Sequence, residues 1–368
     1  MDRSKGGLLY SNDPIKAGLE VLLNKNSKRQ LPSFGEENPS EIILDIYAII
    51  YLALTGLVYG IEQSSIKTVI TQETKEVIEQ WLEGINRENY VASMGIRENG
   101  SLCLQSVENI RQATQDIQKV FRLIIEKSEI IKPALVDMPP IMLHVQKIVD
   151  ISVYSSMKLS ISNNIPWLCI DEMLAGLFIA SEWKQVNAIK LFTELGNLLE
   201  FEKKKEGLYL YAQEIIPYAL TFRDIKLLSI SNDKHSHYFL AKILFLHPKL
   251  FTDINTAVNC LAEILTSVLC KGFLTGQFIK GLRINSPTNN GYTERVFNAC
   301  CYLIMQCDDS TSERKLAMLL CKLFVIFEHI PEMIRLIEVL ATEFARGHFL
   351  SSPLINSYIK ENFSINKL

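Results

Sequence analysis

The chain has 368 residues, of which 48% are apolar and 21% charged, and its formal net charge is −3. Because one domain usually takes roughly 100–200 residues, this length allows two or three domains or one extended array of repeats. The slight negative charge gives no general attraction to nucleic acid or to anionic lipid. Direct nucleic-acid binding is therefore not expected.

Residues 1–39 are predicted to form an N-terminal arm and linker. Asp13-Pro14 opens a short helix to about Asn24, and the polar, proline-containing stretch that follows is typical of a loop. Met1–Leu9 lacks the apolar core of a secretion signal, and the eight cysteines show no disulfide spacing. We expect a cytoplasmic or nuclear protein.

The segment Ile42–Ile61 contains a single charge, Asp45, and nearly reaches the length of a membrane-spanning helix. No Lys or Arg cluster flanks it, and Ser40 is a suitable N-cap for an ordinary helix. These features favour a buried central helix. A membrane anchor formed by residues 42–61 remains an alternative.

Residues 40–160 are predicted to form an N-terminal helical region. Thr71 caps a helix to about Asn86, and a break over Tyr90–Leu104 precedes an amphipathic helix over Ser106–Lys132. Pro139-Pro140 starts a further helix, to about Lys158, because proline costs no hydrogen bond in the first helical turn.

Residues 161–368 are predicted to form a C-terminal array of short helices. Ser310 and Glu313 fit a capping box, and Pro331 fits a first-turn proline. Helix pairs recur about every 35–45 residues, which is typical of HEAT or armadillo-like units, although no sequence repeat accompanies this period. We therefore predict an all-α protein whose C-terminal part is an irregular α-solenoid. The expected helices cover 168–182, 184–203, 206–220, 235–247, 253–271, 292–307, 312–329, 331–346 and 352–362.

Two polar segments resemble metal-binding motifs of class I terpene synthases, which are all-helical enzymes. Asn232–Ser236 resembles the start of the second motif, and Asp308-Asp309 resembles the aspartate-rich motif. However, Leu240 and Ser312 stand where the motifs require carboxylates, and the two segments occur in the reverse order. Because Mg²⁺–diphosphate chemistry needs several convergent carboxylates, both segments are interpreted as polar loops.

His235 and His237 are two residues apart, so on a helix their side chains point in nearly opposite directions. With no third ligand nearby, they are interpreted as solvated residues at a helix start rather than as a zinc site. Cys300, Cys301 and Cys307 lie in an apolar helical run without a CxxC pair, which favours buried thiols.

The run Lys203-Lys204-Lys205 is interpreted as a solvated, dipole-complementing helix end rather than a phosphate contact. An aromatic group nearby could mark a partner groove, but core packing is favoured for it; its members are Tyr209, Tyr211, Tyr218 and Phe222. The chain contains no GxxxxGK[ST], HExxH or GxSxG motif, which disfavours the common NTPase, zinc-protease and esterase mechanisms.

These observations predict a non-enzymatic scaffold or adaptor subunit that binds partner proteins through a helical-repeat surface. Nuclear chromosome maintenance and cytosolic trafficking are equally compatible with this role. No catalytic, cofactor-binding or metal-binding residue is predicted, and no cofactor. The apolar composition suggests a stable complex with one or more proteins. The alternatives are an all-α enzyme with a buried apolar pocket and a membrane-associated protein anchored through residues 42–61.

Overall fold

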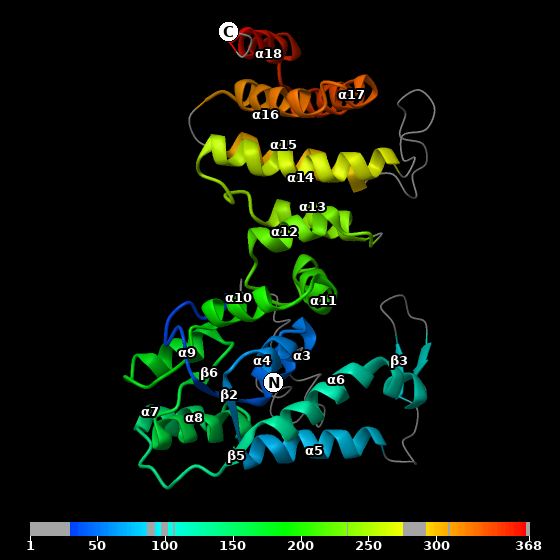
Figure 1. Cartoon of the computed structure of the whole chain (residues 1–368). Coiled ribbons are helices and arrows are strands. Elements are labelled where there is room, and N and C mark those ends of the chain that lie inside the picture. Colours follow the sequence, from blue (N-terminus) through cyan, green and yellow to red (C-terminus); the bar gives the residue numbers. More distant parts are fainter. Residues whose placement is uncertain are drawn as a thin grey trace. The chain divides into compact units, whose positions relative to one another are not determined.

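The computed structural model describes residues 30–86, 93–96, 102–105, 107–233, 235–274, 292–307 and 310–365. The chain divides into two compact units, Met1–Ala219 and Leu220–Leu368, and each is described by itself (Figure 1). In the described residues, sixteen helices and six strands are present. The predicted mainly helical character is confirmed. The prediction of an all-α chain is wrong, because the first unit is built on a parallel sheet.

Four strands of the first unit form a parallel sheet in the order β5-β2-β1-β6. The chain passes from β1 to β2 and β5 on one side, and then returns to place β6 on the other side of β1. The strand order therefore reverses between β1 and β6. The strands are β1 Glu41–Leu44, β2 Lys67–Thr71, β5 Glu129–Ile131 and β6 Trp167–Leu168.

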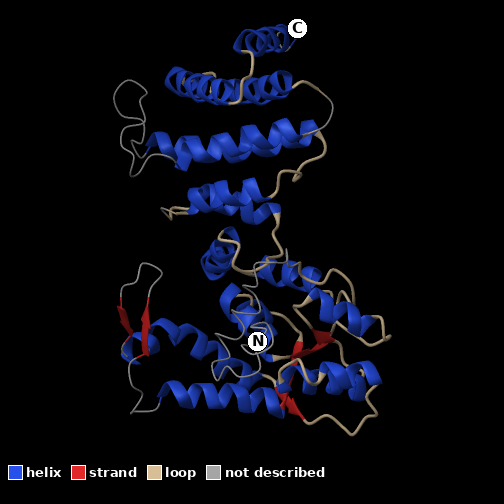
Figure 2. Ribbon diagram, turned by 180° about the vertical axis from the view of Figure 1, so that it is seen from behind, coloured by secondary structure: helices blue, strands red, loops and turns tan. Residues whose placement is uncertain are grey.

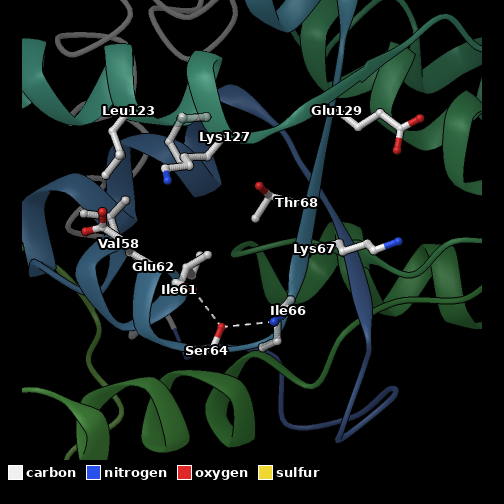
Figure 3. A pocket seen from close by; sticks show the side chains of 11 residues that line it. Val58, Ile61, Glu62, Ser64, Ile66, Lys67, Thr68, Leu123, Lys127 and Glu129 are labelled. Atoms are coloured by element: carbon white, nitrogen blue, oxygen red, sulfur yellow. Dashed lines mark hydrogen bonds between the residues drawn. The ribbon is translucent and has the colours of Figure 1, made fainter.

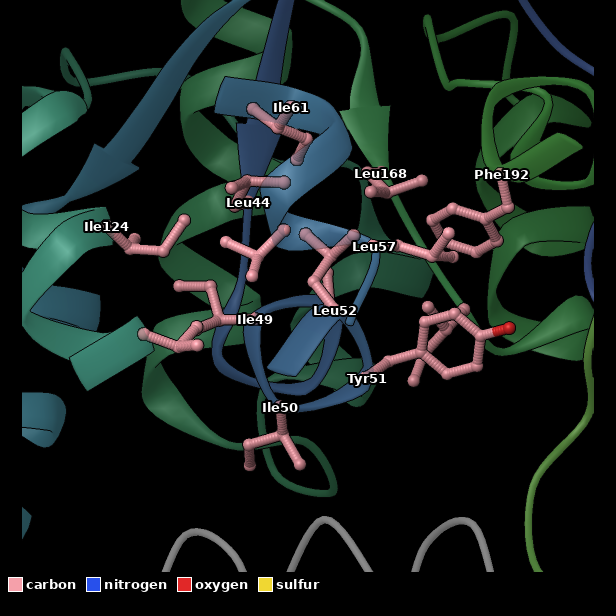
Figure 4. Close-up of a cluster of buried hydrophobic side chains, with 14 of the residues drawn as sticks. Leu44, Ile49, Ile50, Tyr51, Leu52, Leu57, Ile61, Ile124, Leu168 and Phe192 are labelled. Atoms are coloured by element: carbon pink, nitrogen blue, oxygen red, sulfur yellow. The ribbon is translucent and has the colours of Figure 1, made fainter. Parts of the chain in front are cut away.

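Alternate residues of the central strands belong to two separate cores. Ile42 and Leu44 lie in one core, whereas Ile43 lies in the other, as expected for a strand with both faces covered. Figure 4 shows the first core, in which Leu44 and Leu168 from the sheet meet Ile49 and Leu52.

Helices cover both faces of this sheet. The first core includes side chains from α3 Ile46–Thr55, α4 Val58–Gln63, α5 Gln72–Asn86, α6 Val107–Lys127 and α10 Ala188–Leu198. The second core includes side chains from α7 Pro140–Val145, α8 Ile151–Asn163 and α9 Glu172–Ile179. The unit is thus a three-layer α/β/α arrangement, completed by α11 Phe201–Ala212 and an antiparallel hairpin of β3 Ser93–Ile96 and β4 Leu102–Gln105.

The segment Ile42–Ile61 is buried, as predicted, but it is not a single helix. It contains most of β1, then Asp45 as the N-cap of α3, and then α4 after a left-handed turn at Gly56. By length and composition, one helix in the described part of the chain could cross a membrane, α14 Ile254–Leu274. Half of its apolar window is buried within the structure.

Two predicted helices of the N-terminal region are also shorter than expected. The amphipathic helix ends at Lys127, and residues 129–131 pair with β2 as strand β5. The helix begun at Pro140 ends at Val145, and α8 starts separately at Ile151. Thr71 does receive the expected N-terminal hydrogen bond, because the Thr74 backbone N–H donates to its hydroxyl (3.1 Å).

The described part of the second unit consists of helices without strands (Figure 2). Helices separated by one in sequence pack together, α12 with α14 and α14 with α16 in one row, and α13 with α15 and α17 in the other. Thr311, one residue after the predicted Ser310, caps α16. The helices are α12 Phe222–Ile230, α13 Ser236–Leu246, α14 Ile254–Leu274, α15 Tyr292–Gln306, α16 Ser312–Ile326, α17 Pro331–Gly347 and α18 Ser352–Ile365.

Candidate functional site: an acidic edge of the parallel sheet

Three aspartates lie at the carboxyl edge of the sheet. Asp45 directly follows β1, and Asp171 follows β6 by three residues. Asp150 is the N-cap of α8, which packs on both of these strands. Because α8 leads into β6 through a short turn at Asn164, it runs antiparallel to the sheet, and its N-terminus lies at the same edge.

The position of this edge within the topology is informative. Open α/β sheets bind ligands outside the carboxyl ends of their strands, at the point where the strand order reverses. Here that point lies between β1 and β6, the strands that precede Asp45 and Asp171. The fold thus places these two carboxylates where a ligand crevice is expected.

Asp45 is almost fully buried, with 2% of its surface exposed. The Ala48 backbone N–H donates to its Oδ1 (2.8 Å), and the Trp167 indole N–H donates to its Oδ2 (3.0 Å). Burial raises the pKa of Asp45 to about 7, although these two hydrogen bonds act in the opposite direction, and the charge of Asp150 adds to the increase. Asp45 and Asp150 are therefore electrostatic neighbours.

Burial and the same negative charges raise the pKa values of two other side chains. Burial, and then Asp150 and Asp45, raise the pKa of Tyr47. Burial and Asp45 raise the pKa of Cys169, whose Sγ donates to the Asp171 carbonyl oxygen (3.4 Å). A positive ion at this edge would relieve the repulsion between these groups.

Asp150 and Asp171 are half-buried and use one oxygen each in helix capping. Asp150 Oδ1 accepts from the Ser152 N–H (2.8 Å), and Asp171 Oδ1 accepts from the N–H groups of Met173 and Leu174 (2.9 and 3.0 Å). Within the described ranges, Oδ2 of neither aspartate accepts a protein hydrogen bond. Both oxygens are therefore open to a ligand.

Two more polar atoms near this edge lack partners. Glu73 lies in the first turn of α5, directly after β2, and its Oε2 is buried without a hydrogen bond. Ser152 Oγ, in the first turn of α8, is likewise buried without a partner among the described residues. Buried polar atoms normally have partners, so a water molecule or a ligand at this edge would supply their missing hydrogen bonds.

The donor set fits a hard divalent cation. Mg²⁺ prefers oxygen ligands and is commonly bound through one or two carboxylates, with water and a phosphate completing the shell. No three His, Cys, Asp or Glu side chains of the described residues converge as a ready-made metal cage. The site therefore fits only the sparse type of Mg²⁺ coordination, in which Asp150 and Asp171 would hold the ion beside Asp45 and water would complete its shell.

A separate cleft of about 370 Å³ lies at the opposite edge of the sheet, where β2 begins at Lys67. Figure 3 shows that Lys127 on α6, Glu62 on α4 and Thr68 on β2 line this cleft. Its two lysines are balanced by Glu62 and Glu129. The cleft thus has no charge excess that would select a ligand, and the acidic edge is the better candidate site.

The structure corrects two residue-level predictions. His237 is buried rather than solvated, and its Nε2 lies 3.1 Å from the Ser229 carbonyl oxygen. Lys204 is also buried, in the first half of α11 rather than at a helix end, and its Nζ donates to the Gly196 carbonyl oxygen (3.0 Å). His235 is exposed, as predicted.

The other residues considered from sequence do not converge on the acidic edge. Cys300, Cys301 and Cys307 are buried in the second unit, as predicted, and burial raises the pKa of the first two thiols. Of the aromatic group, Tyr209 is buried, and the rings of Tyr211 and Tyr218 lie 6.2 Å apart. Asp308-Asp309 lies outside the described residues.

The fold and site define an α/β/α domain with an acidic carboxyl edge. Consistent with this class, residues 43–177 match the model of a family described as "PIN domain associated with the TPR-GreAB-C-PIN system". The match covers less than half of the chain, and it includes Asp45, Asp150 and Asp171. No curated protein and no solved structure matches the chain.

This match contradicts the prediction of a non-enzymatic protein, because a PIN domain is a nuclease-type fold. A PIN domain does not exclude nucleic-acid binding, which the net charge alone did not lead us to expect. Sequence analysis missed the three aspartates as site residues. The available signal was their shared position, each directly before a helix and two of them just after an apolar strand.

Proposed function

We propose that the first unit is a metal-dependent phosphodiesterase domain that acts on nucleic acid at the edge formed by Asp45, Asp150 and Asp171. The observation that carries this proposal is that Asp45, Asp150 and Asp171, all within the family match, lie at the carboxyl edge of the sheet, where the strand order reverses between β1 and β6. Nucleases commonly use metal ions to stabilise the attacking and leaving oxygens of a phosphoryl transfer.

The residues of the chain would have distinct roles. Asp150 and Asp171 reach solvent and keep an open oxygen, so they would bind an incoming cation directly. The N-termini of α8 and α9 point to the same edge, and their backbone dipoles favour a phosphate there. A bound ion would supply charge stabilisation at the phosphoryl group.

The test is a cleavage assay with the purified full chain and end-labelled single-stranded RNA and DNA. We expect cleavage that needs Mg²⁺ or Mn²⁺, that stops with EDTA, and that is lost in Asp150→Asn and Asp171→Asn. Glu172→Gln is the matched control, because Glu172 is an exposed acidic residue adjacent to Asp171. Cleavage retained by both aspartate variants would contradict the proposed site.

We propose in addition that the second unit is a short α-solenoid that binds a partner protein. Its two rows of helices, packed alternately, support the solenoid arrangement. Several large apolar side chains on it are exposed, as is common at protein-binding surfaces; they include Phe245, Phe273, Leu274, Val325 and Phe349.

This second role is tested by affinity purification from the native cells, comparing the full chain with a truncation that ends at Ala219. A partner that co-elutes in fixed stoichiometry with the full chain and is absent from the truncation supports the solenoid role. A partner retained by the truncation contradicts it. An intracellular location remains an expectation from the sequence.

A further inference from the structure

At the acidic edge, the indole nitrogen of Trp167 forms a hydrogen bond with the carboxyl group of Asp45. Trp167 is fully buried, and its indole N–H donates to Asp45 Oδ2 (3.0 Å). Trp167 on β6 pairs with Ile43 on β1, and both side chains lie on the same face of the sheet. Ile43 precedes Asp45 by two residues. Together with the Ala48 N–H, the indole fixes the plane of the carboxyl group from a second structural element.

Trp167 is itself held firmly. Its backbone N–H donates to the Lys184 carbonyl oxygen (3.2 Å), and its carbonyl oxygen accepts from the Val186 N–H (3.0 Å). Its ring packs edge-on against Phe178, with the centroids 5.1 Å apart, and Phe178 in turn contacts Trp183. The donor position is therefore defined by both backbone and ring contacts.

An indole N–H is a donor only, so it cannot act as a metal ligand. A carboxylate offers about four lone-pair sites, so the hydrogen bonds from Ala48 and Trp167 do not use all the acceptor capacity of Asp45. Carboxylates that bind metals are usually oriented by such outer donors, and removing the donor weakens metal binding about 10–100-fold.

We propose that Trp167 is a positioning residue that orients the Asp45 carboxylate toward a divalent cation at the acidic edge. The proposal rests on the proposed function of the first unit, but it concerns a residue that would touch neither metal nor substrate. It assigns a purpose to the polar atom of a tryptophan at the first position of the two-residue strand β6.

The test is calorimetric titration of the full chain with Mn²⁺. We expect Trp167→Phe to weaken Mn²⁺ binding about 10–100-fold and Asp45→Asn to weaken it at least as much. Trp183→Phe is the matched control, because Trp183 belongs to the same aromatic cluster without bonding to Asp45. If Trp167→Phe fails to fold, 3-benzothienylalanine at position 167 replaces it, since this analogue keeps the ring shape and lacks the N–H.

A spectroscopic readout separates positioning from a purely structural role. With Trp81 and Trp183 replaced by Phe, Trp167 is the sole tryptophan of the chain. We expect the fluorescence of Trp167 to change as Mn²⁺ is added, with the same midpoint concentration as in the calorimetric titration. In the same protein carrying Asp45→Asn, the fluorescence should stay constant.

The outcomes distinguish the two proposals. Wild-type protein that binds no Mn²⁺ at millimolar concentration overturns the proposed metal site and this inference with it. Wild-type binding that is unchanged in Trp167→Phe, or in the benzothienylalanine variant, overturns the positioning role alone. A fluorescence change that persists in the Asp45→Asn background also overturns it.

Discussion

His237 shows how one buried residue makes stability depend on pH. Burial lowers its pKa below 6.5; the Ser229 carbonyl raises it, and Lys271 adds a smaller decrease. The unfolded chain therefore binds a proton more readily, so the stability due to neutral His237 is complete above about pH 6.5 and is lost as the pH falls. We expect wild-type protein to lose more unfolding free energy than His237→Gln between pH 8 and pH 5, measured by urea titration.

His235→Gln is the control for this prediction, because His235 is exposed two residues earlier in the sequence. It should follow the wild-type pH dependence, whereas His237→Gln should flatten it. Equal pH dependence in the wild type and in His237→Gln would show that the buried imidazole is not the responsible group.

At the scale of elements, the turn between α3 and α4 depends on a glycine. Gly56 has φ +72°, and a Cβ atom there would collide with the Lys203 backbone carbonyl oxygen at the start of α11. We expect Gly56→Ala to lower the unfolding free energy by about 1–3 kcal/mol, because alanine disfavours this positive φ and its Cβ would also collide with the carbonyl oxygen. The measurement is the urea midpoint of the full chain.

Gly84→Ala provides the comparison within the same unit. Gly84 lies in α5, and a Cβ atom there would meet nothing within 4 Å. Alanine should therefore raise stability by about 0.5–1 kcal/mol through its better helix propensity. A similar loss in both variants would mean that position 56 has no special backbone requirement.

Elements with one exposed face were predictable from the sequence, whereas the sheet was not. The polar stripe of α6 and the proline of α17 identify helices directly. In contrast, β1 is buried on both faces, so its residues form a continuous apolar run that cannot be distinguished from a buried helix. Because the three aspartates share one edge only through the arrangement of the strands and α8, missing the sheet also meant missing the candidate site.

At the scale of the whole molecule, the two compact units predict that each part folds without the other. The second unit has its own buried apolar side chains, for example Leu265, Phe297 and Leu336, in addition to its helix-to-helix contacts. We expect a fragment of residues 220–368 to give a helical circular dichroism spectrum and a single cooperative urea transition. A fragment that unfolds gradually would show that its core needs the first unit, and the prediction of independent folding would then be wrong.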